Sequence, residues 1–206
     1  MGVASGERVG RVLEGMEILR RLWSEEKVTH KGRFFQFEDV AALPKPMQAR
    51  APIWLAVNPK GDVKPELLDR VLRRVARHAD GWQTDAITPE EFRRRFDRIK
   101  EYASEMGRDP EALESCLHLM VNINDDRDLA YEQAHQFLVS YYGPAFVTPG
   151  LIDLWVAYGP PEEVADKIRS YLDAGCTTPV LRFVGPDMMQ QLGRYTAEVA
   201  PLLERA

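Results

Sequence analysis

The residues best suited to chemistry follow a short apolar run. Residues 53–57 are apolar between two prolines, and the loop after them carries Asn58 and Lys60 before an amphipathic helix begins. A buried run of this length is typical of a strand in a parallel sheet. Backbone N–H groups at a helix start, together with a nearby lysine, favour the binding of a phosphate at this point. The alternative is a solvated loop whose lysines only serve solubility.

A second strand is predicted from Trp82 onward, immediately after the helix. Gly81 is expected to allow a tight turn and Trp82 to fill the core, with a direct ligand contact by Trp82 as the alternative. Thr84 and Asp85 lie nearer the carboxyl end of this strand, where parallel α/β sheets place their binding sites. We therefore expect these two residues to be better placed for a substrate or cofactor.

Residues 115–124 alternate between aliphatic and mixed side chains. This period of two indicates a strand whose aliphatic face packs on helices, so that the other face points into a barrel. Asn122, near the carboxyl end of the mixed face, is the better ligand candidate. His118 lies in mid-strand, and we expect it to be hydrogen-bonded in the interior rather than catalytic.

Arg182 interrupts the apolar run of the last predicted strand, residues 180–184. Burying a guanidinium without a partner is costly, so Arg182 requires a carboxylate, a phosphate or water. A structural ion pair and a ligand contact explain it equally well.

Hydrophobic periodicity predicts the scaffold for these residues. An amphipathic helix opens the chain, a hairpin-like insertion with strands at 27–29 and 34–37 follows, and residues 24–51 connect this part to the first βα unit. Residues 151–158 form only a short segment. The four predicted strands are 53–57, 82–84, 115–124 and 180–184. Since a helix follows each of them, the fold class is α/β with a parallel sheet, about half of an eight-stranded barrel.

Composition narrows the function further. The length of 206 residues suits one domain, and a net charge of -5 argues against a nucleic-acid binder. The sequence contains no GxGxxG, P-loop, GxSxG, HExxH or CxxC motif, so no metal site is expected. Cys116 and Cys176 are expected to be reduced core thiols of a cytoplasmic protein, because the sequence shows no secretory leader. No apolar run approaches the roughly 18 residues of a membrane span.

The order and spacing of several short motifs resemble the carboxyl-terminal part of the bacterial-luciferase-like superfamily of flavin- or F420-dependent monooxygenases and reductases. The matching segments are 14–23 (EGMEILRRLW), 32–35 (GRFF), 44–48 (PKPMQ), 52–56 (PIWLA), 79–82 (ADGW), 107–110 (GRDP), 159–163 (GPPEE) and 173–175 (DAG). The resemblance implies part of a TIM barrel and an oxidoreductase or monooxygenase that acts on a small organic substrate with reduced FMN or coenzyme F420. The cofactor would carry the difficult chemistry, which fits the absence of an obvious nucleophile.

The resemblance also suggests roles for individual residues. Asn58 and Lys60 are the first candidates for the cofactor phosphate, and Thr84 and Trp82 complete the expected cofactor contacts. Asn122 and Arg182 are expected to line the substrate pocket. We assign no catalytic acid or base, because members of the family carry about four strands before the helix that opens this sequence.

A second hypothesis belongs to another functional class. A half-barrel of 206 residues has two unpaired sheet edges and an exposed interior, which a soluble protein must cover. The chain is then a structural or flavin-binding remnant without turnover of its own, completed by a second copy or by a separately encoded amino-terminal half. A third possibility is that Met1 is not the native start and that the sequence comes from within a longer barrel.

Overall fold

The computed structural model describes residues 2–59 and 63–204. It forms two compact units, Met1–Ile53 and Trp54–Ala206. The expectation of a single domain across residues 1–206 stays a prediction.

The first unit consists of a helix and a hairpin. A short 3-10 helix (Ser5–Glu7) leads into α1 (Arg8–Ser24), and β1 (Val28–Lys31) pairs antiparallel with β2 (Gln36–Val40). The insertion is therefore a hairpin, as predicted, but its turn begins at Gly32, two residues later than expected. Residues 41–51 form an irregular connection without helix or strand, as predicted, and it continues through Ile53, so the strand predicted at 53–57 is confined to Trp54–Ala56.

The carboxylate of Glu14 on α1 holds the hairpin turn. It accepts hydrogen bonds from the backbone N–H of Phe34 at 3.1 Å and of Phe35 at 2.9 Å, and it lies 3.1 Å from Nε2 of His30. A Cβ atom at Gly32 would lie 2.1 Å from Oε1 of Glu14. Only glycine allows the carboxylate to come this close, so the contact between Glu14 and the turn at Gly32 holds the hairpin on α1.

The second unit is built on five parallel strands. These are β3 (Trp54–Ala56), β4 (Gly81–Asp85), β5 (Glu114–Ile123), β6 (Val156–Gly159) and β7 (Thr178–Phe183). The prediction of four strands missed β6, because four residues that directly follow a helix give no separate periodic signal.

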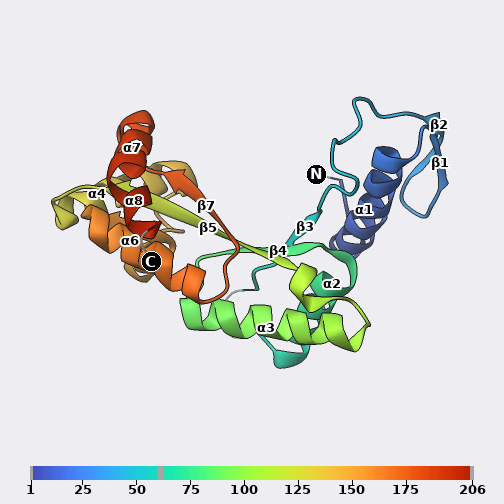
Figure 1. Cartoon of the computed structure of the whole chain (residues 1–206), viewed down its shortest axis with the longest axis horizontal. Helices are drawn as coiled ribbons and strands as arrows, with labels where there is room; N and C mark the ends of the chain where they lie inside the picture. The colour runs from blue at the N-terminus through green and yellow to red at the C-terminus, as the bar shows by residue number, and fades with distance from the viewer. Residues whose placement is uncertain (1, 60–62, 205–206) are drawn as a thin grey trace. The chain divides into compact units, whose positions relative to one another are not determined.

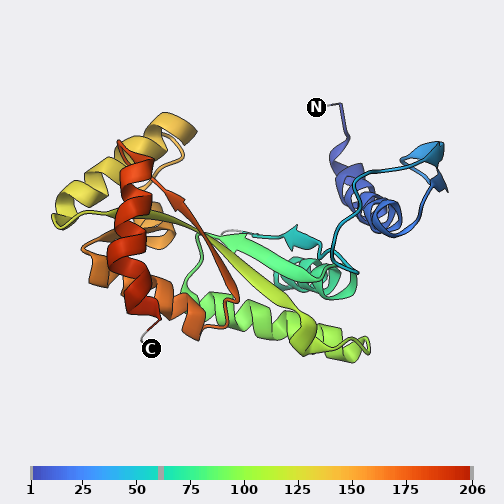
Figure 2. The same ribbon diagram turned by 45° about the horizontal axis from the view of Figure 1, so that its top comes forward.

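The long strand β5 is the centre of this sheet, and Figure 2 shows it side by side with β4. Residues 114–118 of β5 pair with β4, residues 120–123 with β6, and residues 116–121 with β7. Because a strand has only two edges, these overlaps place β4 and β6 along one edge of β5 and β7 along the other.

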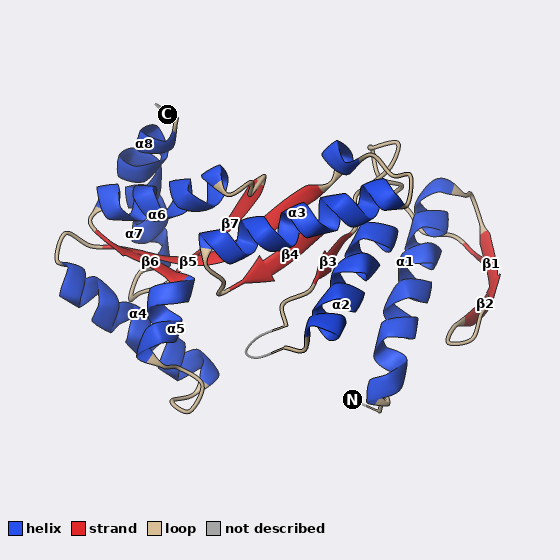
Figure 3. Cartoon of the chain, turned by 90° about the horizontal axis from the view of Figure 1, so that it is seen from below, coloured by secondary structure: helices blue, strands red, loops and turns tan. Residues whose placement is uncertain are grey.

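Helices pack against the sheet, and α4 and α5 lie at its β6 end (Figures 1 and 3). They are α2 (Pro65–His78), α3 (Pro89–Glu105), α4 (Arg127–Tyr142), α5 (Pro149–Trp155), α6 (Pro161–Asp173), α7 (Met188–Arg194) and α8 (Ala200–Leu203), with a 3-10 turn at Pro110–Ala112 and a π-helical stretch at Tyr195–Val199. In Figure 3, α4 and α5 lie on one side of β5, whereas α3 and α6 lie on the other. Among the described residues, no helix is long and apolar enough to cross a membrane.

Trp82 anchors the packing of α3 on the sheet. Its side chain is fully buried against Phe92 and Phe96, with ring centroids 5.0 and 6.4 Å away, and its indole N–H donates to the Val57 carbonyl at 2.8 Å. The structural role predicted for Trp82 is therefore present. The Trp82 indole also links the start of β4 to the loop after β3.

Gly81 serves a different purpose from the tight turn we expected. It is the first residue of β4, and the indole of Trp54 crosses over it to donate a 2.7 Å hydrogen bond to the Glu114 carboxylate. A Cβ atom on Gly81 would lie 2.5 Å from the Trp54 ring and 2.9 Å from the Glu114 carbonyl oxygen. The position requires glycine for this close approach.

We predict that Glu14→Gln weakens the first unit most clearly near neutral pH. Burial raises the pKa of Glu14, but the bonds from Phe35, His30 and Phe34 outweigh that effect and hold the pKa below its ordinary value. A depressed carboxyl pKa contributes stability above the unfolded pKa of about 4.3, and this stability is lost as the pH falls through the folded value.

Urea unfolding at several pH values between 7 and 2 measures this contribution. The wild-type chain should lose its advantage over Glu14→Gln as the pH falls. The exposed carboxylate of Glu26 supplies the control variant Glu26→Gln, which should follow the wild type. Equal stability of Glu14→Gln and wild type at pH 7 would contradict the prediction.

Candidate functional site

The open face of the sheet carries polar residues near one another on three strands, with Asp85 and His118 at the same level and Arg182 two residues farther along, opposite Met120. Asp85, the last residue of β4, is the register partner of His118 on β5, and His118 is in turn the partner of Val180 on β7. Register partners in parallel strands have their side chains on the same face of the sheet. Arg182 follows Val180 by two residues, so its side chain is on this face as well. A row of Asp85, His118 and Arg182 thus crosses β4, β5 and β7, and Val180 beside it remains 42% exposed.

The stagger of the strands explains why His118 belongs to a sheet end. It is the fifth residue of the ten in β5, yet its register partner Asp85 is the last residue of β4. Binding sites in parallel sheets form at the carboxyl ends of the strands. His118 is therefore in the middle of β5, but it lies level with the carboxyl end of β4.

Asn58 fixes the position of Asp85. Its amide nitrogen donates to the carboxylate Oδ1 of Asp85 at 2.7 Å and to the backbone carbonyl of the same residue at 2.5 Å. The next residue, Ala86, has a φ of 41°, a left-handed conformation that is uncommon for a residue with a Cβ atom. Such backbone strain concentrates at functional sites, and here the two bonds from Asn58 hold the segment in place.

His118 is half-buried between groups of opposite charge. Burial lowers its pKa, Asp85 raises it, and Arg182 lowers it again, with a net pKa below the ordinary value. The ring packs edge-on against Trp155 of α5, with centroids 6.0 Å apart, and the Trp155 indole N–H donates to the His118 carbonyl at 3.1 Å. At neutral pH the imidazole is therefore uncharged and can accept a proton.

Arg182 reaches toward α4. Its guanidinium carbon lies 5.3 Å from the ring centroid of Phe137 and 4.4 Å from that of Tyr141. Aromatic faces attract a guanidinium, so this pair of rings stabilises the charge and leaves the hydrogen-bonding edge of the guanidinium for a ligand. Whether Arg182 contacts a substrate stays a prediction.

Asn122 lies deeper in the same face, where α4 and α5 cover the end of β5. It is fully buried, and its amide nitrogen donates to the Val184 carbonyl at 2.9 Å and to Oε1 of Gln133 at 3.2 Å. Its Oδ1 atom is buried without a hydrogen-bond partner. The structure thus differs from an open barrel interior at this end, because Met120 of the same face packs into an apolar cluster with helix residues such as Leu138.

The cofactor residues predicted on β4 are on the opposite face. Thr84 follows Trp82 by two positions, so both point away from Asp85. Thr84 is 3% exposed, and its buried hydroxyl oxygen has no hydrogen-bond partner. Cofactor contacts by Trp82 and Thr84 stay predictions. The sequence held the signal for choosing Asp85 instead, because a core role for Trp82 places the open face at odd-numbered positions.

Part of the loop after β3 lies outside the described residues. Lys60 falls outside the described residues, whereas the carbonyl of Pro59 accepts a 3.2 Å hydrogen bond from Arg95 on α3. The helix that follows, α2, begins after Lys64, and no side chain among the described residues caps its first turn. Pro65 has no N–H group, and the N–H groups of Leu67 and Leu68 bond to the Lys64 carbonyl at 2.9 and 3.1 Å. A cofactor phosphate at this helix start therefore stays a prediction.

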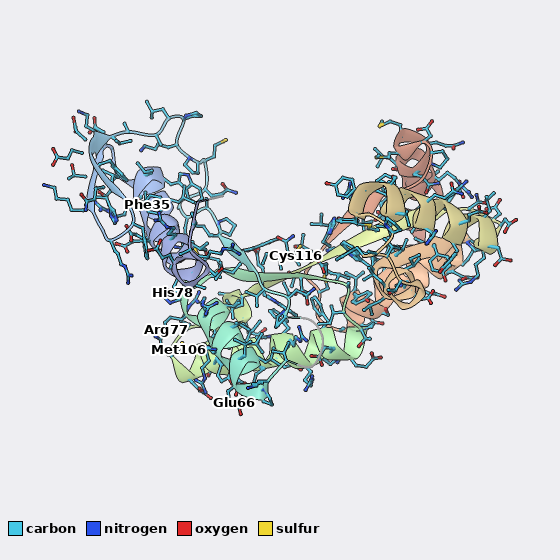
Figure 4. All side chains as sticks on the ribbon, turned by 180° about the vertical axis from the view of Figure 1, so that it is seen from behind. Phe35, Glu66, Arg77, His78, Met106 and Cys116 are labelled. Carbon is cyan, nitrogen blue, oxygen red and sulfur yellow. The ribbon has the colours of Figure 1, made fainter. Side chains whose placement is uncertain are left out.

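The cysteines occupy the interior of the second unit. Cys116, labelled in Figure 4, lies on the sheet two residues before His118, and both it and Cys176 are buried and unbridged. Burial raises the pKa of Cys116 to about 11, so it is an inert thiol near neutral pH. Within the described part of the chain, no three His, Cys, Asp or Glu residues gather closely enough to bind a metal ion.

The arrangement combines a carboxylate, an uncharged imidazole and a fixed cation in one row. Asp85 favours the protonated imidazole through its charge, His118 can exchange a proton, and Arg182 attracts polar or anionic substituents. These groups suit a small substrate that carries a hydroxyl or carbonyl group, because such a substrate changes its protonation when it is oxidised or reduced.

Comparison with known proteins identifies relatives of this chain. A family model described as luciferase-like monooxygenase matches residues 1–178. Among curated proteins, the F420-dependent glucose-6-phosphate dehydrogenase of Segniliparus rotundus is 25% identical over 224 residues, which span 96% of this chain and 62% of that protein.

Solved structures agree in fold. An F420-dependent secondary alcohol dehydrogenase in complex with an F420-acetone adduct has a TM-score of 0.80 and 19% identity, and the match covers 98% of this chain and 64% of that chain. The coenzyme F420-dependent tetrahydromethanopterin reductase from Methanopyrus kandleri has a TM-score of 0.70 and 18% identity, with 93% and 62% covered. These likenesses confirm the predicted partial TIM-barrel fold. The chain spans less than two thirds of each of these proteins.

We predict that Trp82→Phe lowers stability without weakening cofactor binding. The substitution removes the N–H that bonds to the half-buried Val57 carbonyl, and a lost hydrogen bond of this kind costs about 0.5–1.5 kcal/mol. Thermal unfolding and titration with oxidised F420 measure the two effects separately. A loss of affinity with unchanged stability would instead support a direct cofactor contact by Trp82.

Proposed function

Because the chain belongs to the luciferase-like monooxygenase family, we propose that it transfers two electrons between coenzyme F420 and a small substrate with a hydroxyl or carbonyl group. The observation that carries this proposal is the row of Asp85, His118 and Arg182, which lies level with the carboxyl end of β4 and near that of β7. A row of this kind binds the polar group that reacts and exchanges its proton.

The choice of F420 over FMN rests on the relatives. The curated relative and both solved structures described above carry F420 in their names. In this chain, the start of α2 would receive the cofactor phosphate, and Asn58 and Asp85 would form one side of the pocket. The cofactor would accept or donate the electrons, and the residues of the chain would bind and orient the substrate and exchange its proton.

Titration of the 206-residue chain with oxidised F420 tests the proposal. We expect micromolar affinity and, with small secondary alcohols or sugar phosphates, loss of the F420 absorbance. Asn58→Ala should weaken binding by about tenfold, since it releases Asp85 and removes hydrogen bonds worth about 1 kcal/mol. Asp128→Asn, at an exposed position on α4, is the matched control and should bind as the wild type does.

Two results would contradict this assignment. Oxygen consumption with reduced FMN, in the absence of any F420 turnover, would point to monooxygenase chemistry. No binding of either cofactor by a folded chain would remove the proposal of an enzyme that works alone.

A second candidate function follows from the sheet edges. Among the described residues, β3 pairs only with β4, and β7 pairs only with β5. Strands with one unpaired edge readily accept another strand. The chain could therefore be a half-barrel that is completed by a second copy or by a separate amino-terminal half.

We expect light scattering to reveal association if this second candidate holds. Lysine substitutions at Val180 on β7 should then shift the chain toward monomer, because a charge on this exposed residue disfavours burial against a partner. A monomer that binds F420 would argue against the need for a partner.

A further inference from the structure

We infer that His118 accepts the proton of the substrate hydroxyl, with Asp85 as the residue that positions it. This inference deepens the proposed function and rests on it. The family resemblance suggested no acid or base in this part of the chain, and the sequence favoured a purely structural histidine. The structure assigns the role through the neighbours of His118.

The first argument is geometric. Asp85 and His118 are register partners on one face of the sheet, and the side chains of such partners are neighbours. Two hydrogen bonds from Asn58 fix the Asp85 carboxylate, and the left-handed Ala86 follows directly. A carboxylate held in this place acts on the neighbouring imidazole through its charge, which favours the protonated form of His118.

The second argument concerns charge and access. Of the elements around the imidazole, β4 contributes the negative Asp85, β7 the positive Arg182, and α5 the indole of Trp155. The two charges act on His118 in opposite directions, and burial, the largest effect, lowers its pKa and favours the neutral imidazole. The neighbouring Val180 is 42% exposed, so this part of the face is open to a ligand.

The reaction balances with these groups. When an alcohol is oxidised, its C–H bond breaks and the hydrogen leaves with both electrons to the deazaflavin, which is reduced. The O–H bond breaks as well, its electrons form the carbonyl double bond, and the proton moves to the free nitrogen of His118. The imidazolium that results is stabilised by Asp85 and later releases the proton to water. In the reverse direction His118 returns the proton to the carbonyl oxygen.

Titration of His118 by nuclear magnetic resonance tests the positioning without any cofactor. Asp85→Asn should lower the pKa of His118 by about one unit, and Arg182→Gln should raise it, because the two charges act in opposite directions. Asp128→Asn should leave it unchanged. A pKa of His118 that responds to neither substitution would overturn the arrangement, whatever the function of the chain.

Kinetics test the proton transfer itself. With F420 and an accepted alcohol, His118→Gln should lower kcat at least a hundredfold while F420 affinity changes by less than threefold, since general base catalysis contributes about 10²–10⁴-fold. Asp85→Asn should shift the acid limb of the kcat profile to lower pH. An active chain whose His118→Gln variant keeps its kcat would refute the role of His118 and leave the proposed function standing. A chain without F420 binding would refute the proposed function, and the titration would still report on the pair.

Discussion

The parallel pairing of β5 with three other strands is the constraint on which the second unit depends. β5 contacts β4 and β6 along one edge and β7 along the other, so its register decides which residues of distant segments become neighbours. Asp85, His118 and Arg182 come from segments nearly a hundred residues apart in sequence. A slip of one residue in β5 would turn His118 to the opposite face and disperse the row.

Several of the short family motifs turn out to be structural devices. Glu14 on α1 and Gly32 in the hairpin turn belong to different motifs, yet the carboxylate of one requires the missing side chain of the other. The same holds for Gly81, which leaves space for the Trp54 indole on its way to Glu114. These contacts explain why the spacing of the motifs identified the fold, whereas the motifs themselves do not determine a substrate.

The sequence predicted the helices and strands better than it predicted which residues of different strands become neighbours. The alternation in residues 115–124 correctly indicated β5, and the core role of Trp82 was recognised from its position. Strand β6 was missed because it is short and follows a helix without a turn. The importance of Asp85 and His118 depends on the stagger between β4 and β5, which is set by tertiary packing and leaves no local pattern. The alternation within β4 could still have separated Thr84 from Asp85.

Hydrogen–deuterium exchange of the 206-residue chain with and without oxidised F420 tests most directly whether the open face of the sheet is the ligand site. If it is, exchange slows in peptides that contain Asn58, the end of β4 and the middle of β5, while the hairpin β1–β2 exchanges as before. Slower exchange confined to the hairpin, or no change at the sheet despite measured F420 binding, would contradict the account.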